Sequence, residues 1–441
     1  MADGNRMPAV RLDTSVPALL VRIGRYPVHA GTLGVVRSLG RLGVPVYAIT
    51  EDRLTPIALS RHVVGRFIWP GSEWHDTERL VESLCALGRS LRRPVVPVAT
   101  DDEAAVLLAE HAAALAEYFL LPRVTPTLPR QVASKRGLFD LCMAHDVPTP
   151  RTLFPTCRDD LRALADELTF PVVAKNVAPW TRLRAPAVST TTLVSSGREL
   201  LDRFAGLDDL SSVLLQEYIP HEHAEDWFVH AYCDEGSSTA LSFVGRKAYA
   251  WPPGRGCTVD ARAAINPMLS ELTARFCKEI GYRGVNDLDW RYDRRDGRFK
   301  LVDFNPRVGA QFRFGQTEDG VDVVRALHLA MTGRTVPAGD QDYSRRLIVE
   351  NLYLPARVLQ RLSRLPAAPR LQPPGVRTHG AWLEASGRDP LPVLAMVLRF
   401  GGQAVASVFR AAYRNVRLRL AGHARTGSGP RSHASRAGGD R

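Results

Sequence analysis

The residues best suited to do chemistry lie together between Val285 and Arg307, in the sequence VNDLDWRYDRRDGRFKLVDFNPR. Two apolar-rich runs flank an Arg-Asp-Gly triplet at 295–297, which predicts a three-residue hairpin loop with its glycine in the left-handed conformation. With that loop, the two strands pair so that Asp289 lies directly opposite Asp303. The sequence therefore predicts two carboxylates side by side on adjacent strands.

The same register places Asp287 opposite Asn305, and all four polar side chains share one face because side chains alternate along a strand. Like charges directly opposite each other on a sheet cost up to about 1 kcal/mol. We therefore expect a positive group beside Asp289 and Asp303. The other face is apolar and suits packing against a helix; it carries Leu288, Trp290, Tyr292, Val302 and Phe304.

Two kinds of positive group fit this acidic face. One is a divalent cation with oxygen ligands, and magnesium, which prefers a few carboxylates together with substrate phosphates, suits it best. The other is a structural salt-bridge cluster, because Arg291 and Arg307 fall on the same face. The hairpin alone leaves both interpretations open.

The middle of the chain must hold this hairpin, and its strands occur in blocks. A long helix is expected from about Pro267 to Ile280, just before the hairpin. Such blocks of strands are typical of an α+β domain. Apolar runs predict strands at FPVVAK (Phe170 to Lys175), TTTLV, VLLQEYI (Val213 to Ile219), WFVHAYC and TALSFVGRK.

The N-terminal part has the pattern of a parallel α/β lobe. The runs ALLVRIG, VVRSLGRLG and VPVYAIT predict a strand, a helix and a second strand. Gly24, Gly31 and Gly34 lack the G-x-G-x-x-G spacing of a dinucleotide site, and no Walker A sequence occurs. Three prolines in LPRVTPTLP (Leu121 to Pro129) predict a domain boundary.

Beyond Gly333 the sequence becomes rich in proline and then predicts an amphipathic helical region from about Leu391 to Leu420. Its uncharged runs are too short to span a bilayer. Arginines beside its apolar residues suit weak contact with an anionic membrane surface. The favoured interpretation is a helix packed on the body with a solvated basic face. From Thr426 the chain is rich in Ser, Gly and Arg and is expected to be disordered.

Composition excludes several classes of protein. The 441 residues suffice for two or three lobes, and 45% hydrophobic with 24% charged residues is typical of a globular protein. The six cysteines lack the spacing of a metal site or redox pair. The N-terminus lacks the apolar core of a secretory signal, so a cytoplasmic location is expected. Much of the net charge of +12 lies in the tail, and without an aromatic-basic motif we expect no nucleic-acid binding.

The sequence DFNPR at Asp303 to Arg307, preceded by Asp289, resembles the signature of the last two catalytic strands in the ATP-grasp superfamily. The match covers roughly Leu19 to Arg334, and the chain looks most like carboxylate-amine ligases of the D-aspartate-ligase-like sort. Further pieces recur in the family's order: Ser134-Lys135 opening a helix, Val172 to Lys175 ending a strand, and Gln216 to Pro220.

This resemblance implies a fold that is α/β and α+β: an ATP-grasp fold with an N-terminal parallel α/β (pre-ATP-grasp) domain and a helical C-terminal extension. The implied domains are residues 1–123, the catalytic domain 124–335, the extension 336–424 and a disordered basic tail 425–441. The implied cofactors are ATP and Mg²⁺, with Mn²⁺ as the alternative ion. The partners are small-molecule carboxylate and amine substrates, and the oligomeric state is left open.

The resemblance also assigns nucleotide-binding roles. Lys135 and Lys175 would contact the ATP phosphates. Asp226, or the adjacent Glu225, would hold the ribose hydroxyls. The residues that would meet the adenine edge are Gln216, Glu217, Tyr218 and Ile219.

The remaining roles concern the metal and the reacting groups. Arg307 would stabilise charge on the transferring phosphoryl group. Arg246 and Lys247 are candidates for the acyl phosphate or the substrate carboxylate. The implied magnesium ligands are Asp289, Asp303 and Asn305.

The sequence departs from the family pattern in two places. Asp303 stands where many relatives have glutamate, so its carboxylate reaches about one methylene less far. The segment NVAPWTRLRAPAV after Lys175 lacks the glycine-rich loop that many relatives fold over the phosphates. Arg182 and Arg184 would supply positive charge there instead.

Together these features predict a ligase that phosphorylates a carboxylate with ATP and couples the acyl phosphate to an amine, releasing ADP and phosphate. The alternative is a catalytically inactive nucleotide-binding regulatory or scaffold protein with the same fold. The facing acids favour the ligase, because a retired site has no reason to keep them. The identity of both substrates depends on loops that the sequence does not define.

Overall fold

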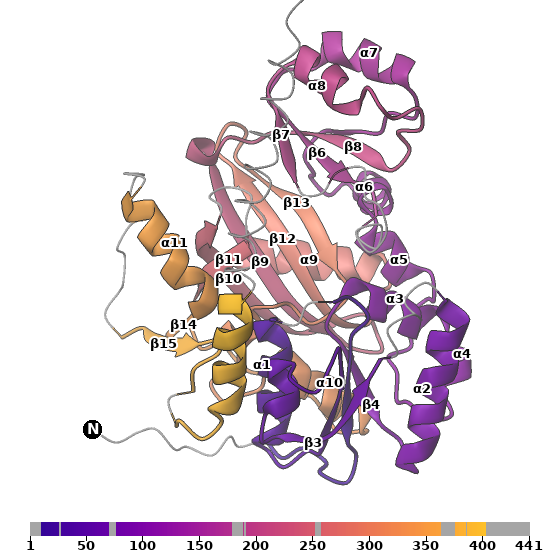
Figure 1. Ribbon diagram of the computed structural model, residues 1–441, viewed down its shortest axis with the longest axis vertical. Coiled ribbons are helices and arrows are strands. Elements are labelled where there is room, and N and C mark those ends of the chain that lie inside the picture. The colour runs from indigo at the N-terminus through magenta and orange to yellow at the C-terminus, as the bar shows by residue number, and fades with distance from the viewer. Residues whose placement is uncertain are drawn as a thin grey trace, which may run out of the picture.

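The computed structural model describes residues 10–25, 28–69, 76–178, 188, 191–251, 257–362, 375–384 and 386–402. Figure 1 shows an N-terminal lobe at the bottom, a long twisted sheet in the middle and a small cap lobe at the top. The predicted tail from Thr426, and most of the predicted helix beyond 402, lie outside the described residues. No helix in the described ranges is long and apolar enough to cross a membrane.

The N-terminal lobe is a parallel sheet in the order β3-β2-β1-β4, as expected of an α/β unit. The predicted strand, helix and strand are β1, α1 and β2. Strand β1 is buried throughout because helices cover both faces of a parallel sheet. The elements are β1 (Ala18–Val21), α1 (Ala30–Gly40), β2 (Val46–Thr50), β3 (Val63–Ile68), α2 (Thr77–Leu91), β4 (Val96–Ala99), α3 (Asp102–Glu110) and α4 (Ala112–Leu115).

The cap lobe is an antiparallel four-stranded sheet in the order β5-β8-β6-β7, with α7 and α8 above it in Figure 1. Two helices, α5 and α6, lead into it from the N-terminal lobe. The elements are α5 (Leu128–Ala133), α6 (Lys135–Ala144), β5 (Thr152–Leu153), α7 (Arg158–Glu167), β6 (Val172–Asn176), β7 (Thr192–Val194), α8 (Gly197–Phe204) and β8 (Val213–Glu217).

The central sheet has the order β13-β12-β9-β10-β11-β14-β15 and is antiparallel except between its last two strands. One face packs on α5, α6 and α9, and the other packs on α1 and α10. Its elements are β9 (Ala224–Cys233), β10 (Thr239–Trp251), β11 (Cys257–Ala263), α9 (Pro267–Glu279), β12 (Gly284–Asp293), β13 (Arg298–Asn305), α10 (Val323–Met331), β14 (Arg345–Ile348), α11 (Glu350–Leu362) and β15 (Arg377–Gly380).

The C-terminal extension, expected to be helical, also contributes strands. β14 and β15 extend the central sheet, with Arg345 opposite Arg377. Each strand has only four residues and lies among prolines and arginines, so an apolar pattern of strand length is missing. Strand β11, which joins them to β10, was not predicted from the sequence either.

The hairpin of β12 and β13 confirms the predicted pairing of Asp289 with Asp303 and of Asp287 with Asn305. The loop prediction was wrong. Asp293 pairs with Arg298, so the loop has four residues, and one extra residue in β13 restores the expected register at the acids.

The extra residue corrects the predicted apolar face. Trp290 pairs with Leu301, and Leu301 is fully buried in the core beneath the sheet. Val302 is only half-buried and does not belong to that core, although we expected it there. The shift also turns Lys300, which pairs with Arg291, onto the same face as the acids.

Glycines on α1 let the loop after β13 lie flush against that helix. A Cβ atom at Gly31 would lie 2.8 Å from the Cα atom of Ala310. A Cβ atom at Gly34 would lie 2.7 Å from Cδ of Arg313. This close approach holds the loop that follows the DFNPR sequence against the N-terminal lobe.

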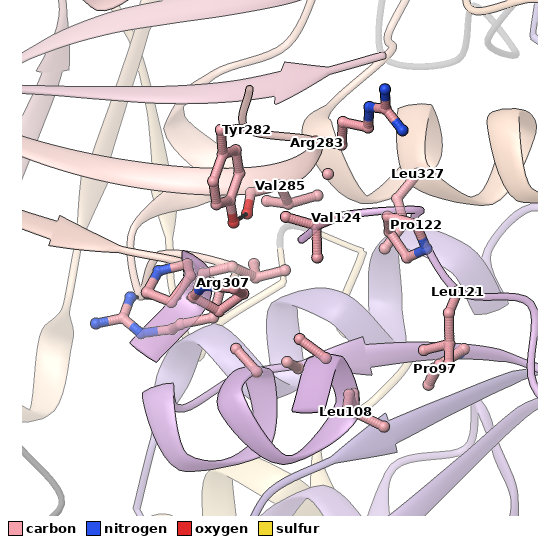
Figure 2. Close-up of a pocket in the computed structure, with 17 residues that line it drawn as sticks. Pro97, Leu108, Leu121, Pro122, Val124, Tyr282, Arg283, Val285, Arg307 and Leu327 are labelled. Carbon is pink, nitrogen blue, oxygen red and sulfur yellow. Dashed lines mark hydrogen bonds between the residues drawn. The ribbon is translucent and has the colours of Figure 1, made fainter. Parts of the chain in front are cut away.

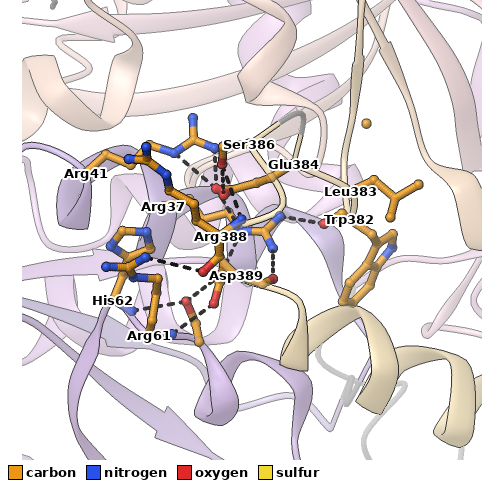
Figure 3. A network of polar contacts seen from close by, with 12 residues as sticks. Arg37, Arg41, Arg61, His62, Trp382, Leu383, Glu384, Ser386, Arg388 and Asp389 are labelled. Carbon is orange, nitrogen blue, oxygen red and sulfur yellow. Dashed lines mark hydrogen bonds and ion pairs between the residues drawn. The ribbon is translucent and has the colours of Figure 1, made fainter.

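A buried charge network fastens Trp382, Glu384 and Asp389 to the N-terminal lobe (Figure 3). Arg37 on α1 is fully buried; its Nε donates to Asp389 at 2.9 Å and its Nη1 donates to the carbonyl of Trp382 at 2.6 Å. Asp389 also accepts from the hydroxyl of Ser60 at 2.8 Å. Arg41 pairs with Glu384 at the rim of this network and is 42% exposed.

We expect Arg37→Gln to lower the free energy of unfolding by about 3 kcal/mol, because Asp389 would stay buried without its charge partner. Arg41→Gln is the matched control and should cost less than about 1 kcal/mol, because Arg41 is 42% exposed and Glu384 keeps Arg37 as a partner at 3.3 Å. Urea denaturation of both variants measures the difference. Equal losses would show that the buried pair holds the segment no better than the exposed one.

Candidate active site

The two facing carboxylates each have a lysine as their partner. Lys247 Nζ lies 2.8 Å from Asp289 Oδ1, and Lys135 forms an ion pair with Asp303. Both carboxylates are 31% exposed, so water and ligands can reach them. The expected positive groups are therefore present, but they are lysines and not the arginines of the hairpin itself.

These lysines come from separate elements. Lys135 is the first residue of α6, and the helix starts there because the side chain of Ser134 accepts from the backbone N–H of Gly137 at 3.4 Å. Lys247 lies on β10, two strands away from Asp289 in the sheet order. The site is thus assembled across the central sheet and the helix that leads to the cap lobe.

Lys175, on β6 of the cap lobe, donates to Gln216 Oε1 at 2.9 Å. Burial lowers the pKa of Lys175 to about 8, and the charge of Lys135 acts in the same direction. Asp303 opposes both effects, which places Lys175 within electrostatic reach of that acid. The cap lobe therefore brings a third lysine within electrostatic reach of the acid pair.

The acids on this face differ in how readily they ionise. Burial raises the pKa of Asp287 to about 7, and repulsion from Asp289 adds to the rise. Burial also acts to raise the pKa of Asp303, but Lys135 and then Lys175 outweigh it and leave the pKa below its ordinary value. The carboxylate nearest the lysines thus stays charged.

Arg307 connects the central sheet to the N-terminal lobe. Its Nη1 donates to Asp287 Oδ2 at 3.0 Å, and its Nη2 donates to Asn305 Oδ1 at 2.9 Å. Its Nε lies 3.2 Å from Oδ1 of Asp102, the first residue of α3. Burial acts to lower the pKa of Arg307, but Asp102 and Asp287 outweigh burial and raise it, so the guanidinium is held charged between two lobes.

Apart from Gln216, which accepts from Lys175, the residues assigned to adenine and ribose lie toward the loop end of the hairpin. Arg291 donates to the carbonyl of Ile219 at 2.9 Å and to Asp226 at 3.0 Å. Glu217 forms an ion pair with Arg295, and Lys300 Nζ lies 3.7 Å from it. Tyr218 follows directly after β8 and is half-buried. The strand β8 and the hairpin are thus tied together by charge.

Arg246 is not brought to the acid pair. Its guanidinium lies 3.2 Å from Glu225 and 5.7 Å from the ring centre of Trp227. Neighbouring residues on a strand point to opposite faces, so Lys247 reaches Asp289 and Arg246 does not. Arg182 and Arg184, expected to close over the phosphates, lie outside the described residues.

Sequence reasoning missed three residues at this site. Asp102 belongs to another lobe, and Lys300 reaches the polar face only through the extra residue in β13. His230 on β9 is fully buried, 3.7 Å from Asp287, and burial lowers its pKa to about 3. Nothing local in the sequence marks any of the three as part of a site.

The donor set fits a magnesium ion that also binds phosphates. Among the described residues, no group of three or more His, Cys, Asp or Glu side chains could hold a metal alone. Two adjacent carboxylates and the amide oxygen of Asn305 are hard oxygen ligands, and Mg²⁺ takes one or two carboxylates with its remaining positions on water and phosphate. The carboxylates now bound to lysines are the ones this ion would use.

A cavity of about 70 Å³ lies at the joint between the lobes, beside Arg307. Figure 2 shows Tyr282, Val285 and Arg307 on one side of it and Pro97 and Leu108 of the N-terminal lobe on the other. Neither acid of the facing pair lines it. This largely apolar void therefore belongs to the lobe interface and not to the acid site.

The three sheets, the cap lobe and the acidic hairpin define an ATP-grasp fold. No family model matches the chain. Among solved structures, L-amino acid ligase from Bacillus licheniformis has a TM-score of 0.54 at 15% identity, covering 73% of this chain and 75% of that one. The biotin carboxylase domain of Hydrogenobacter thermophilus 2-oxoglutarate carboxylase has a TM-score of 0.52 at 17% identity, covering 73% and 71%. The predicted ATP-grasp fold is confirmed.

Sequence comparison finds a relative of this chain whose activity is named. D-aspartate ligase from Enterococcus faecium is 25% identical over 309 residues, which cover 66% of this chain and 72% of the relative. The predicted resemblance to carboxylate-amine ligases of the D-aspartate-ligase-like sort is therefore confirmed.

We expect nucleotide affinity to fall as the pH rises above about 8, because Lys175 loses its charge there and a neutral amine attracts phosphate weakly. Lys175→Arg should keep its affinity to higher pH, since arginine stays charged. Calorimetric titration of the protein with ATP between pH 7 and 9.5 would measure this, with roughly a threefold to tenfold loss for the natural lysine. Parallel curves for the two proteins would assign the pH dependence to another group.

Proposed function

We propose that this chain is an ATP- and magnesium-dependent ligase that converts a carboxylate to an acyl phosphate and joins it to an amine, releasing ADP and phosphate. One observation carries the proposal: Asp289 and Asp303 face each other, and each side chain is 31% exposed. Lys247 forms an ion pair with Asp289 and Lys135 with Asp303, and Lys175 lies within electrostatic reach of both acids. Two acids and three lysines at one accessible point suit a metal-bound polyphosphate, in which each charge gains an opposite partner.

The chemistry explains why such a site is needed. A carboxylate is a poor electrophile because its charge repels nucleophiles and oxide does not leave. Phosphorylation supplies a leaving group, and magnesium, when bound, would neutralise charge on the phosphates that react. Asp289, Asp303 and Asn305 would hold that ion, and the solved MgADP complex of the Hydrogenobacter carboxylase domain supports a nucleotide of this form in this fold.

The lysines and Arg307 would position the reacting groups. Lys135 and Lys175 would bind phosphate oxygens, and Lys247 would bind the substrate carboxylate or acyl phosphate. Arg307 is fixed by Asp102 and Asp287, so its guanidinium needs little reorganisation to stabilise charge as it develops on the phosphoryl group or the tetrahedral oxyanion. Because Asp102 belongs to the N-terminal lobe, that lobe would orient Arg307 as well as cover the site.

The nucleotide base would lie between β8 and the loop end of the hairpin. The backbone of Glu217, Tyr218 and Ile219 would hydrogen-bond the adenine edge. Asp226 would accept from the ribose hydroxyls, and its hydrogen bond with Arg291 would then weaken. The names of the relatives support substrates in the amino-acid class, with an amino acid as one reactant. The domain limits at 123, 335 and 424 and the cytoplasmic location stay predictions.

The rival proposal is a nucleotide-binding regulatory or scaffold protein without turnover. The lysine pairs on Asp289 and Asp303 give it some support, since they satisfy both acids without a metal. The exposure of the acids and the retention of Arg307 favour the ligase. The two proposals differ in whether ATP is consumed.

We expect magnesium-dependent release of phosphate from ATP when the protein is supplied with pairs from a panel of amino acids. ADP, and not AMP, should accumulate in equal amount with the phosphate. Coupled phosphate detection and chromatography of the nucleotides measure both products. Tight ATP binding with no turnover on any pair would favour the scaffold instead.

We expect Asp303→Asn to reduce that turnover by about 100-fold or more, because the amide keeps the shape but loses the charge that would bind the ion. Asp208→Asn, a change at a surface position of the cap lobe whose side chain is 94% exposed, is the matched control and should leave the rate unchanged. Thermal unfolding of both variants shows whether the fold is kept. Full activity in Asp303→Asn would remove this acid from the mechanism.

A further inference from the structure

The helix at residues 391–402 is apolar on its outer face as well as on its inner one. Ala395 and Met396 are buried against the body, where Met396 joins the main core. Four large apolar side chains on the helix are more than half exposed: Leu391 at 54%, Leu394 at 56%, Val397 at 55% and Leu398 at 67%. A helix that is apolar all round is expected to be covered on every side. The favoured prediction was a helix packed on the body with a solvated basic face; within residues 391–402 the exposed side chains are mainly apolar, and the other arginines of the predicted basic face lie outside the described residues.

The apolar surface continues onto the N-terminal lobe. Arg399 Nε donates to the carbonyl of Leu54 at 3.2 Å, and Arg399 also forms an ion pair with Asp52. Leu54 is 67% exposed beside the helix. We call this surface the apolar patch; it consists of Leu54, Leu391, Leu394, Val397 and Leu398. The charge network of Figure 3 joins Glu384 and Asp389, which precede the helix, to the N-terminal lobe that carries Leu54.

Three arginines lie next to the apolar patch, either along the sequence or through a contact. Arg53 adjoins Leu54, and Arg61 donates to the carbonyl of Arg388 at 3.4 Å just before the helix. These three arginines are exposed, and no ion pair links any of them to a carboxylate within the described ranges. The carboxylates nearby, Asp52, Glu384 and Asp389, are already paired with Arg399, Arg41 and Arg37. We call Arg53, Arg61 and Arg388 the basic rim.

Charge decides what covers the apolar patch. After residue 402 the sequence has eight arginines and a single acid, Asp440. That segment would bring more positive charge to the basic rim, and a second copy of the chain would set its own rim against this one. Both are opposed by repulsion between like charges. An apolar surface with anionic groups at its boundary satisfies both the leucines and the arginines.

We propose that the apolar patch and its basic rim dock this protein onto the surface of a membrane containing anionic lipids. The leucines enter the boundary between headgroups and acyl chains, and the rim arginines meet lipid phosphates. The contact is peripheral and reversible, and it does not depend on the proposed ligase activity.

Sedimentation of the full chain with vesicles tests this docking. We expect the protein to pellet with vesicles of equal parts phosphatidylcholine and phosphatidylglycerol, and to stay in solution with phosphatidylcholine alone. Raising the salt concentration should weaken binding, because exposed charges are screened. Absence of binding to both kinds of vesicle would overturn the proposal.

Paired substitutions distinguish binding through the apolar patch from nonspecific binding through other exposed apolar residues. Leu394→Glu together with Leu398→Glu should weaken binding to the anionic vesicles by at least about tenfold, because two leucines that would enter the membrane are lost and two negative charges face the lipid. Ile265→Glu with Met268→Glu is the matched control: these residues are 68% and 61% exposed elsewhere, and binding should not change. Thermal unfolding confirms that both variants fold.

Two other outcomes would replace the membrane with another partner. If the Leu394 and Leu398 variant binds vesicles as tightly as the natural chain, the arginine-rich end alone accounts for binding and the helix face does not dock. If light scattering shows a dimer that this variant dissociates, a second copy covers the apolar patch. Either result would overturn the assignment.

Discussion

The proposed chemistry depends on two carboxylates, Asp289 and Asp303, that are held opposite each other on adjacent strands. Asp289 and Asp303 occupy opposed positions of an antiparallel pair, where like charges destabilise the sheet. The strands tolerate them because Lys247 and Lys135 supply opposite charge from β10 and α6. The apolar face of the same hairpin is buried in a core with Leu288, Leu301 and Phe304, so packing fixes the positions that charge alone would separate. Packing of the apolar face of the hairpin thus holds the two acids on the opposite face in position.

A second constraint acts between lobes. Arg307 is bound at once by Asp287 of the central sheet and Asp102 of the N-terminal lobe, so the orientation of its guanidinium depends on how the two sheets meet. Gly31 and Gly34 allow the loop after β13 to approach α1 closely. The clamp of Arg37 on Asp389 holds the C-terminal segment against the same helix. The N-terminal lobe is therefore structurally coupled to the acid site although it supplies neither facing acid.

The sequence predicted the facing acids correctly, because alternation along strands places them on one face and two unpredicted features of the hairpin cancel in the register. It was insufficient for the path of the chain between them: a four-residue loop and an extra residue in β13 compensate each other, and no local pattern distinguishes that pair of features from a three-residue loop. Lys300 was missed for this reason. Asp102 and His230 were missed because their role arises only from contact between distant segments. The short strands β14 and β15 lack the apolar periodicity on which strand prediction depends.

The lysines on the acids bear on the choice between a metal site and a salt-bridge cluster, which the sequence left open. Both interpretations place positive charge on the same carboxylates. The lysines and a metal ion could therefore bind these carboxylates in turn, and the two interpretations do not exclude each other. A nucleotide phosphate would attract Lys135 and Lys175, and a cation arriving with that phosphate would take the lysine's place on Asp303. Each acid would keep an opposite charge throughout this exchange, so the cost of exposing unpaired carboxylates is avoided at every stage. A lysine with a pKa lowered to about 8 by burial, such as Lys175, gains more from such a phosphate than a solvated lysine would. The ion pairs seen in the structure are thus consistent with a site arranged to accept a metal-bound nucleotide.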